Sequence, residues 1–302
     1  MSGGRLQRVL PDWAVAVSRY VRVHHVVPNL IRPKTFNEKV LHRILFGRQP
    51  WMAMVADKYR VRDYVRDQLG ASILPELHHV TTDPDTIPFE LLPDRFVAKP
   101  THGSGWVEIV HDKTQLDPAK LRQTCRSWLG QNYYEQTREW IYKDITPRIL
   151  IEEFIDDGSV NAPNDYKLFV FGGRVKFILV TMDRFDVRAH VLMDRDWNQA
   201  DVTMAYSRYR RPAPPPPHLA QMIAAAETLA HGMDFVRADF YDTRDKLFFG
   251  ELTATPGCGL DRFEPLSFDA HLGALWKLGD PVKPRSRSSW NRPNPTPVCT
   301  DR

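Results

Sequence analysis

The chain has 302 residues, of which 42% are hydrophobic, and its 41 Lys and Arg outnumber its 37 Asp and Glu by four. That length suits one large domain or two to three packed subdomains, and the hydrophobic fraction excludes a wholly disordered protein. Five of the basic residues lie within residues 280–302, so the excess positive charge reflects that segment and does not favour a specific nucleic-acid partner.

The cysteine content and the apolar segments bear on where the protein works. Cys125, Cys258 and Cys299 are far apart with no C-x-x-C spacing, which indicates neither a zinc ribbon nor a disulfide framework and fits a reducing compartment. No apolar run approaches the roughly 18 residues of a membrane span, and Asp12 and Arg19 interrupt the first apolar stretches. We therefore expect a cytoplasmic protein without a transmembrane segment. The alternative is peripheral association, in which the first helix rests on a membrane surface.

Residues 5–70 are expected to be mainly helical. Valines and arginines mix near helical spacing in the first stretch. Thr35 and Glu38 have the spacing of a capping box, which predicts the start of a second helix. Gly70 is expected to end a third helix that begins near residue 57.

From residue 71 the sequence changes to short β-rich runs separated by Pro and Gly. The expected strands are 95–100, 106–110, 149–155, 166–171, 174–181, 235–241 and 247–254. Gly172 and Gly173 are typical of a hairpin turn, and helices are expected within 116–142 and 217–233. The fold class is therefore α+β with mostly antiparallel strands in the second half, and residues 280–302 are expected to be a disordered basic tail.

The last two strands are expected to form a hairpin with one polar and one apolar face, because side chains alternate with a period of two. The residues expected on the polar face are Arg237, Asp239, Tyr241, Phe249, Glu251 and Thr253. Those expected on the apolar face are Val236, Ala238, Phe240, Phe248 and Leu252.

In this hairpin Asp239 and Glu251 should lie nearly opposite each other. Directly opposed like charges are unfavourable in a sheet. A divalent cation would resolve the conflict, since Mg²⁺ prefers carboxylate oxygens. The alternative is a solvated outer face on which Arg237 is the counter-ion.

A glycine-containing loop follows the strand at 95–100. Lys99 ends the strand, and Gly103, Ser104 and Gly105 follow it. Glycines let backbone N–H groups approach an anion closely, and a lysine adds a point charge. The loop matches neither a Walker A motif nor a dinucleotide fingerprint. An ordinary hairpin turn with an exposed lysine is the alternative.

A third polar element lies in the apolar strands at 149–171. Glu152 and Glu153 stand in the first strand, and Asp165 and Lys167 share one face at the start of the second. Ionisable groups inside apolar strands are costly unless they are paired or solvated. The alternative to a binding role is a salt bridge at the rim, for instance between a glutamate and Lys167.

Two further clusters have weaker signals. Asp194 and Asp196 form a D-x-D, which sugar-nucleotide transferases use to hold a metal, although a β-turn explains the same residues. Arg184 and Arg188 could clamp an acidic substrate, or could be solvated loop arginines.

Taken in chain order, the strand lysine, the glycine loop, the E-E-F-I strand and the R-x-D hairpin resemble the ATP-grasp superfamily. Five segments resemble the TupA-like ATP-grasp family more specifically, and that family is associated with teichuronopeptide and other cell-surface polysaccharides. The segments are 33–40, 56–65, 96–105, 165–176 and 238–259. Thr253 departs from the pattern, because the superfamily usually has Asn at this place.

The resemblance implies a nucleotide site, a metal site and a catalytic arginine. The residues implied to bind ATP are Lys99, Gly103, Ser104, Gly105, Glu152, Glu153, Phe154, Ile155, Asp165 and Lys167. Asp239 and Glu251 would hold Mg²⁺, with Thr253 as a substitute ligand, and Arg237 would stabilise the transferred phosphoryl group.

The resemblance also implies an ATP-grasp fold and a reaction. We expect a helical region at 1–94, a central subdomain at 95–171 and a C-terminal subdomain at 172–279, with ATP between the last two. The expected reaction joins a carboxylate to an amine through an acylphosphate, with an acid or amine that is linked to a glycan or its precursor. A glycosyltransferase that uses the D-x-D, or a non-catalytic nucleotide-binding scaffold, are the alternatives.

Overall fold

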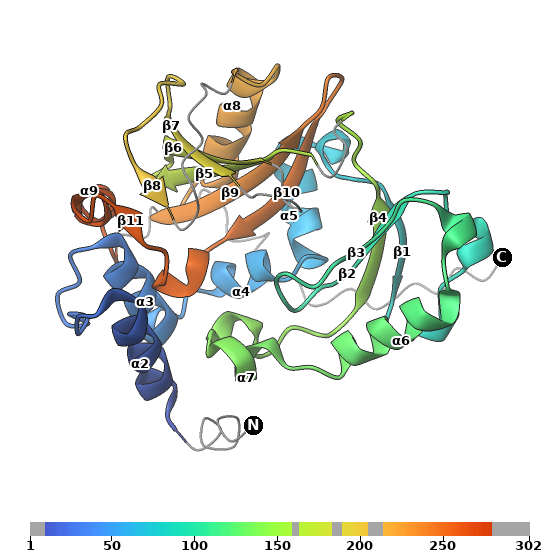
Figure 1. The fold of residues 1–302 in the computed structure, drawn as a ribbon, viewed down its shortest axis with the longest axis horizontal. Coiled ribbons are helices and arrows are strands. Elements are labelled where there is room, and N and C mark those ends of the chain that lie inside the picture. The colour runs from blue at the N-terminus through green and yellow to red at the C-terminus, as the bar shows by residue number, and fades with distance from the viewer. Residues whose placement is uncertain (1–9, 159–162, 183–188, 205–213, 280–302) are drawn as a thin grey trace.

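The computed structural model describes residues 10–158, 163–182, 189–204 and 214–279 (Figure 1). The basic segment at 280–302 lies outside this part of the chain, as do Arg184 and Arg188. Within the described ranges, no helix combines the length and the apolar character that crossing a membrane requires.

The first part of the chain is helical, as the sequence predicts. The helices are α2 (Asp12–His24), α3 (Phe36–Phe46), α4 (Pro50–Ala56) and α5 (Arg60–Leu69). The capping box at the start of α3 is present, since the Thr35 side chain accepts from Glu38 N–H and the Glu38 side chain accepts from Thr35 N–H. Gly70 follows α5 with a φ of 87°, which confirms it as the helix end. The apolar face of α2 is buried against α3 at Ala16, Tyr20 and Leu41.

A four-stranded antiparallel sheet forms one side of the molecule. Its strands, in spatial order, are β1 (Leu77–Thr81), β4 (Ile149–Glu153), β2 (Phe96–Pro100) and β3 (Glu108–Val110). Helix α6 (Pro118–Leu129) covers one face through a core that includes Leu121, Cys125 and Trp128. Strand β1 was not expected from the sequence.

A five-stranded antiparallel sheet forms the other side. Its strands, in spatial order, are β10 (Leu247–Thr253), β9 (Phe235–Asp242), β5 (Asp165–Phe171), β6 (Arg174–Met182) and β7 (Ala189–Asp194). Helix α8 (Leu219–Leu229) packs on one face, whereas α3 and α9 (Ser267–Leu275) pack on the other around Phe36 and Trp276. Gly172 and Gly173 form the β5–β6 turn with positive φ angles, as expected.

The remaining elements are short. They are α7 (Tyr133–Thr137), β8 (Thr203–Met204), β11 (Phe263–Glu264) and the 3₁₀ helices η1 (Ala71–Ile73), η2 (Pro84–Thr86), η3 (Phe89–Leu91), η4 (Lys113–Gln115), η5 (Trp140–Tyr142) and η6 (Pro256–Gly259). Strands β8 and β11 pair with each other.

The two sheets divide the chain between β4 and β5. A boundary after residue 171 would separate β5 from β6 and β9, the two strands to which β5 is hydrogen-bonded. Likewise β1, within the region 1–94, pairs with β4. We therefore propose that the boundary between the two halves of the fold falls between β4 and β5, with α4 and α5 lying between the sheets (Figure 1).

The β9–β10 hairpin departs from the expected face pattern at one place. Glu251 pairs with Asp239, as expected, but Phe249 pairs with Phe240, so the register shifts by one residue at Gly250. This β-bulge turns Phe249 into the core against Phe240 and leaves Phe248 on the opposite face beside Lys246. The expected positions of Phe248 and Phe249 were therefore wrong, because a bulge breaks the period of two.

Candidate active site

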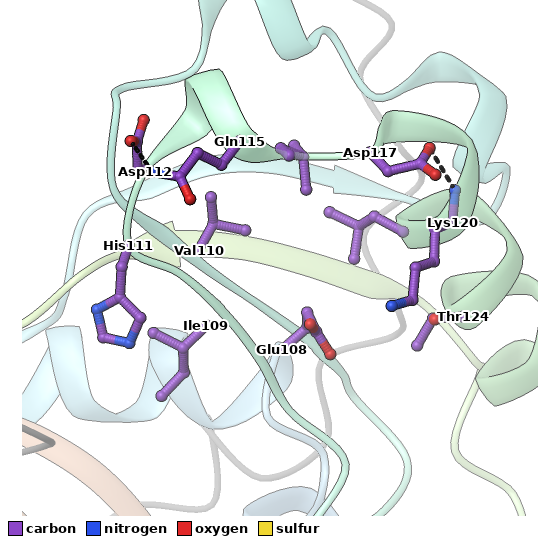
Figure 2. Close-up of a pocket in the computed structure, with 11 residues that line it drawn as sticks. Glu108, Ile109, Val110, His111, Asp112, Gln115, Asp117, Lys120 and Thr124 are labelled. Carbon is purple, nitrogen blue, oxygen red and sulfur yellow. Dashed lines mark hydrogen bonds between the residues drawn. The ribbon is translucent and has the colours of Figure 1, made fainter.

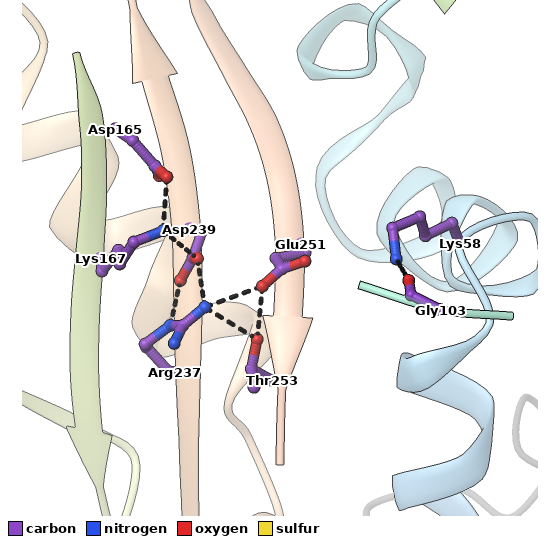
Figure 3. Close-up of polar contacts among 8 residues, drawn as sticks. All are labelled: Lys58, Gly103, Asp165, Lys167, Arg237, Asp239, Glu251 and Thr253. Carbon is purple, nitrogen blue, oxygen red and sulfur yellow. Dashed lines mark hydrogen bonds and ion pairs between the residues drawn. The ribbon is translucent and has the colours of Figure 1, made fainter. Parts of the chain in front are cut away.

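A cluster of charged side chains lies on β9 and β10, where Arg237 contacts two opposed carboxylates (Figure 3). Its Nε and NH2 atoms donate to the two oxygens of Asp239 at 2.7 and 2.6 Å. The same NH2 donates to Glu251 Oε1 at 2.7 Å and to Thr253 Oγ1 at 3.1 Å. Arg237 is thus the counter-ion of both carboxylates, as in the alternative offered above, but Asp239 is buried, so this is not the solvated outer face of that alternative.

Lys167 of β5 joins the same cluster from the neighbouring strand. Its Nζ lies 2.9 Å from Asp239 Oδ2 and also forms an ion pair with Asp165, whose side chain is 2% exposed. Because Lys167 is a register partner of Asp239, the sheet itself places the ammonium beside the carboxylate. The salt bridge that involves Lys167 therefore runs to Asp165 and Asp239, and not to a glutamate of β4.

Burial and neighbouring charge set the protonation states here. Burial alone would raise the pKa of Glu251, but Arg237, Lys58 and Lys167 together hold that pKa far below its usual range. Burial lowers the pKa of Arg237, yet Asp239 and Glu251 outweigh it and raise that pKa overall. The cluster therefore keeps an ionised carboxylate and permanent cations together in a largely desolvated place.

The donor set suits a hard cation. Asp239, Glu251 and Thr253 supply two carboxylates and a hydroxyl, and Thr253 Oγ1 donates to Glu251 Oε1 at 2.8 Å. No cluster of three His, Cys, Asp or Glu side chains with metal-binding geometry occurs in the part of the chain that the structure describes. A cation here would share the two carboxylates with Arg237. These residues therefore fit one Mg²⁺ ion whose remaining ligands come from a bound phosphate or from water.

A second charged group lies on the four-stranded sheet. Glu152 of β4 is buried and forms ion pairs with Lys99 of β2 and, at 2.6 Å, with Arg62 of α5. Arg62 also donates to the Pro75 carbonyl at 2.7 Å, so a second contact fixes the guanidinium that holds Glu152. Sequence reasoning missed Arg62, because nothing local links α5 to a strand 90 residues later.

The residues after Glu152 turn away from this ion pair. Glu153 accepts a hydrogen bond from the backbone N–H of Glu76 at 2.9 Å. Phe154 lies beneath the Arg95 guanidinium and beside the His111 ring. Glu152 is buried and residues 153–155 are half-buried, so this segment is the end of β4 at which the chain becomes more accessible.

The glycine loop is held from beneath by aromatic side chains. A Cβ at Gly103 would lie 2.7 Å from the Trp106 ring, so only glycine fits there. Gly105 has a φ of 77° with open space around it. The neighbouring His102 is buried and bonds through Nε2 to the Trp128 carbonyl at 3.0 Å, which fits the loop-packing role that its position indicates.

Lys58, which the sequence analysis did not single out, connects the two charged groups. Its ammonium donates to the Gly103 carbonyl, and its backbone N–H donates to the Thr101 carbonyl at 3.2 Å (Figure 3). Burial lowers its pKa, and Glu251, Lys99 and Glu152 are the next strongest influences on that pKa. The lysine lies between α4 and α5 in sequence, so only the tertiary fold reveals its contact with the glycine loop.

The D-x-D acts as a turn. Asp194 Oδ1 accepts from the backbone N–H groups of Asp196 and Asn198 at 2.9 and 2.8 Å, and both of its oxygens contact the Asn198 side-chain amide. This is the β-turn expected as the alternative to a metal motif, and it occupies the carboxylate.

A cavity of about 480 Å³ lies apart from these groups, between β3, η4 and α6 (Figure 2). Its polar lining includes Glu108, Asp112, Asp117 and Lys120. None of the residues assigned to nucleotide or metal binding lines it. The hollow is therefore separate from the candidate active site.

Several solved structures match this chain at low identity and low TM-score. D-alanine–D-alanine ligase from Bacillus anthracis in complex with ATP matches with 14% identity and a TM-score of 0.42, over 68% of this chain and 56% of that one. The ATP-grasp ligase PsnB, in complex with a precursor, Mg and ADP, matches with 12% identity and a TM-score of 0.37, over 80% and 61%. The N5-carboxyaminoimidazole ribonucleotide synthetase PurK, as an ADP complex, matches with 10% identity and a TM-score of 0.43, over 73% and 51%.

At such identities the likeness concerns the fold alone, and this chain spans between half and two thirds of the length of those proteins. No curated protein matches the sequence. The model of one family, described as TupA-like ATPgrasp, matches residues 38–277, which include both charged groups and the glycine loop. The expected ATP-grasp fold is thereby confirmed, and the chain belongs to the TupA-like ATPgrasp family.

Proposed function

We propose that this protein is an ATP-dependent ligase that joins a carboxylate to an amine through an acylphosphate. The observation that carries the proposal is a set of cations on separate segments. Lys167 and Arg237 contact the opposed carboxylates of β9 and β10. Lys99 pairs with Glu152 of β4, and Lys58 donates to the carbonyl of Gly103 in the glycine loop. A triphosphate needs such a concentration of positive charge, and a phosphoryl transfer needs a hard cation beside it.

Residues from both sheets would bind the nucleotide. Lys58, Lys99 and Lys167 would contact the phosphates, and the backbone of 103–105 would cover them. The segment 152–155 would form the adenine hinge, and Asp165 would reach the ribose. The ion pairs that these lysines make with Glu152 and Asp165 support this proposal, because they hold the ammonium groups in place before ATP arrives.

Asp239 and Glu251 would hold Mg²⁺, with Thr253 as a weaker oxygen donor. When bound, the ion neutralises charge on the phosphates and polarises the transferred group. Arg237 would donate to the oxygens of the same group as negative charge shifts between them. Its guanidinium is kept charged by Asp239 and Glu251, so it needs no proton at the moment of transfer.

The chemistry has two steps. A carboxylate oxygen of the acid attacks the γ-phosphorus, the bond to the bridging oxygen of ADP breaks, and an acylphosphate forms. The amine nitrogen then attacks the acyl carbon, phosphate leaves, and the nitrogen gives up a proton to form the amide. A water-excluding loop must protect the acylphosphate, and the glycine loop would do this. The close contact of Gly103 with the Trp106 ring supports this role.

We propose a cell-surface polysaccharide or its precursor as the carrier of the acid or amine, and the cytoplasm as the place of reaction. The resemblance to the TupA-like family supports the first statement. The scattered cysteines and the apolar pattern support the second.

Hydroxylamine trapping tests the reaction class. Candidate acids, including uronic and amino acids, are incubated with Mg²⁺ and ATP in the presence of hydroxylamine. An acylphosphate yields a hydroxamate together with ADP. A stable phosphate ester would identify a kinase, ADP formation without hydroxamate would contradict the acylphosphate, and no ATP turnover with any acid or amine would favour a nucleotide-binding scaffold.

A further inference from the structure

The segment that joins α2 to α3 exposes three large aliphatic side chains. Val26, Val27 and Ile31 are 57%, 78% and 90% exposed, and all three lie within six residues. In Figure 1 this segment lies at the edge of the molecule farthest from the four-stranded sheet. Single exposed aliphatic residues are ordinary on a protein surface, but three on one short loop form a protruding apolar patch.

The loop is held in one shape. Asn29 Oδ1 accepts from the backbone N–H groups of Ile31 and Arg32 at 3.2 and 2.9 Å. Glu38 accepts from the backbone N–H groups of Asn29 and Lys34, both at 2.8 Å. Pro28 is buried, and Leu30 packs against the α2–α3 core. The aliphatic residues on either side of these anchors are therefore presented outward by a fixed backbone, so a contact there costs little ordering entropy.

The chain that flanks the loop is rich in basic residues. Residues 13–37 contain Arg19, Arg22, Arg32 and Lys34 and have no Asp or Glu. Arg19 is used internally, since it donates to the backbone of residues 136 and 137. The other three are exposed, and none forms an ion pair with another residue in the described ranges. Glu38, the next acid along the chain, is occupied by the backbone N–H groups that shape the loop.

We propose that this loop docks the protein on an anionic lipid surface. Val26, Val27 and Ile31 enter the interface between headgroups and acyl chains, while Arg22, Arg32 and Lys34 lie at the level of the lipid phosphates. A protein partner would need an apolar pocket of matching shape with acidic residues around it. An anionic bilayer offers an apolar interior and negative headgroups, and it needs no matching shape. The docking element is the loop and not helix α2, whose apolar face is buried. The proposal is independent of the nucleotide site.

Sedimentation with lipid vesicles tests the proposal on the full chain. The vesicles contain about 70% phosphatidylcholine and about 30% phosphatidylglycerol, at low salt. The combined change Val26→Ser, Val27→Ser and Ile31→Ser is expected to weaken binding about tenfold or more. Leu91→Ser with Leu266→Ser removes exposed aliphatic side chains elsewhere and is expected to bind like the wild type. Unchanged melting temperatures show that both variants fold.

The charge is tested separately. Arg32→Gln with Lys34→Gln is expected to weaken binding about tenfold at low salt, and binding to pure phosphatidylcholine vesicles is expected to be much weaker for every variant. The basic segment 280–302 is present in all variants, so it cannot produce these differences. Equal binding by the serine variant and the wild type would overturn the proposal. It would also be overturned if the serine changes convert a dimer to a monomer in ultracentrifugation while vesicle binding persists, since the patch would then join two copies of the chain.

Discussion

Asp239 and Glu251 are direct register partners on β9 and β10, and one guanidinium nitrogen of Arg237 lies 2.6 Å from the first carboxylate and 2.7 Å from the second. Two opposed carboxylates would destabilise a hairpin without a shared cation. The same pair of carboxylates is proposed to hold the Mg²⁺ of Mg·ATP. Its electrostatic repulsion, which destabilises the hairpin, therefore accompanies a proposed function.

Removing one charge from this pair should lower both ATP turnover and the stability of the fold. Asp239→Asn is expected to lower ATP turnover by at least about 100-fold, because a hard anionic ligand is lost. It should also destabilise the fold by about 3 kcal/mol, since Arg237 and Lys167 lose a buried partner. Turnover at saturating Mg²⁺ and urea unfolding measure the two effects.

Asp196→Asn is the control for this change, because among the described residues Asp196 contributes its backbone N–H, not its carboxylate, to the D-x-D turn. Normal turnover in Asp239→Asn would remove this residue from the metal site, whereas loss of turnover in Asp196→Asn would revive the glycosyltransferase alternative.

Lys58→Met should weaken ATP binding about tenfold or more while leaving the fold stable, because methionine fills much of the same half-buried volume without the charge. Calorimetric titration with ATP measures the affinity. Lys120→Met, at the hollow in Figure 2, is the matched control and should bind ATP normally. Equal affinities in the two variants would exclude Lys58 from the phosphate site.

The pH dependence of stability should report the buried carboxyl of Glu139. Burial raises its pKa, although Thr255 and Cys258 donate hydrogen bonds to it, the latter at 3.2 Å. Between the ordinary pKa of 4.5 and the raised pKa, the carboxyl of Glu139 therefore binds more protons in the folded state than in the unfolded state. Stability from this group is fully present below the ordinary pKa and is lost as pH rises through the raised pKa.

Urea unfolding across this window should show that component in the wild type and not in Glu139→Gln. Glu90→Gln, at an exposed position, should keep the wild-type profile. A component that strengthens with rising pH would mean that Glu139 is stabilised as the anion, contrary to the sign worked out above.

Gly250→Ala should disturb the bulge that sets the site. A Cβ there would lie 3.0 Å from the Asp239 carbonyl oxygen and 3.2 Å from the Tyr241 ring. We expect a loss of about 1 kcal/mol of stability, with a larger fall in turnover because Glu251 shifts relative to Asp239. At Gly130, where the nearest atom is 3.5 Å away, the same change should be nearly neutral in both measurements. A Gly250→Ala protein with full turnover would show that the bulge does not control the carboxylates.

The parts of this site that depend on the local sequence pattern could be predicted from the sequence. Asp239 and Glu251 were expected to face each other, because strand alternation and a short turn suffice to place them. The bulge at Gly250 escaped prediction, since it depends on how closely the Asp239 backbone approaches the neighbouring strand. Lys58 and Arg62 escaped for a related reason: their partners lie 45 and 90 residues away, and only the folded chain brings them together.

Strand β1 shows the same limit in the fold. Its sequence, L-H-H-V-T, has little β-rich character of its own, and it forms because the apolar strand β4 offers a free edge. The long apolar strands of the five-stranded sheet were predictable, because continuous runs of aliphatic and aromatic residues indicate buried strands.

Calorimetric titration of the wild-type protein with ATP, in the presence and absence of Mg²⁺ and in parallel with a UDP-sugar, tests the central claim most directly. We predict that ATP binds, that Mg²⁺ tightens binding, that Asp239→Asn abolishes the Mg²⁺ effect, and that the UDP-sugar does not bind. Binding of the UDP-sugar without any binding of ATP would contradict the claim that the charged groups on the two sheets bind a nucleoside triphosphate.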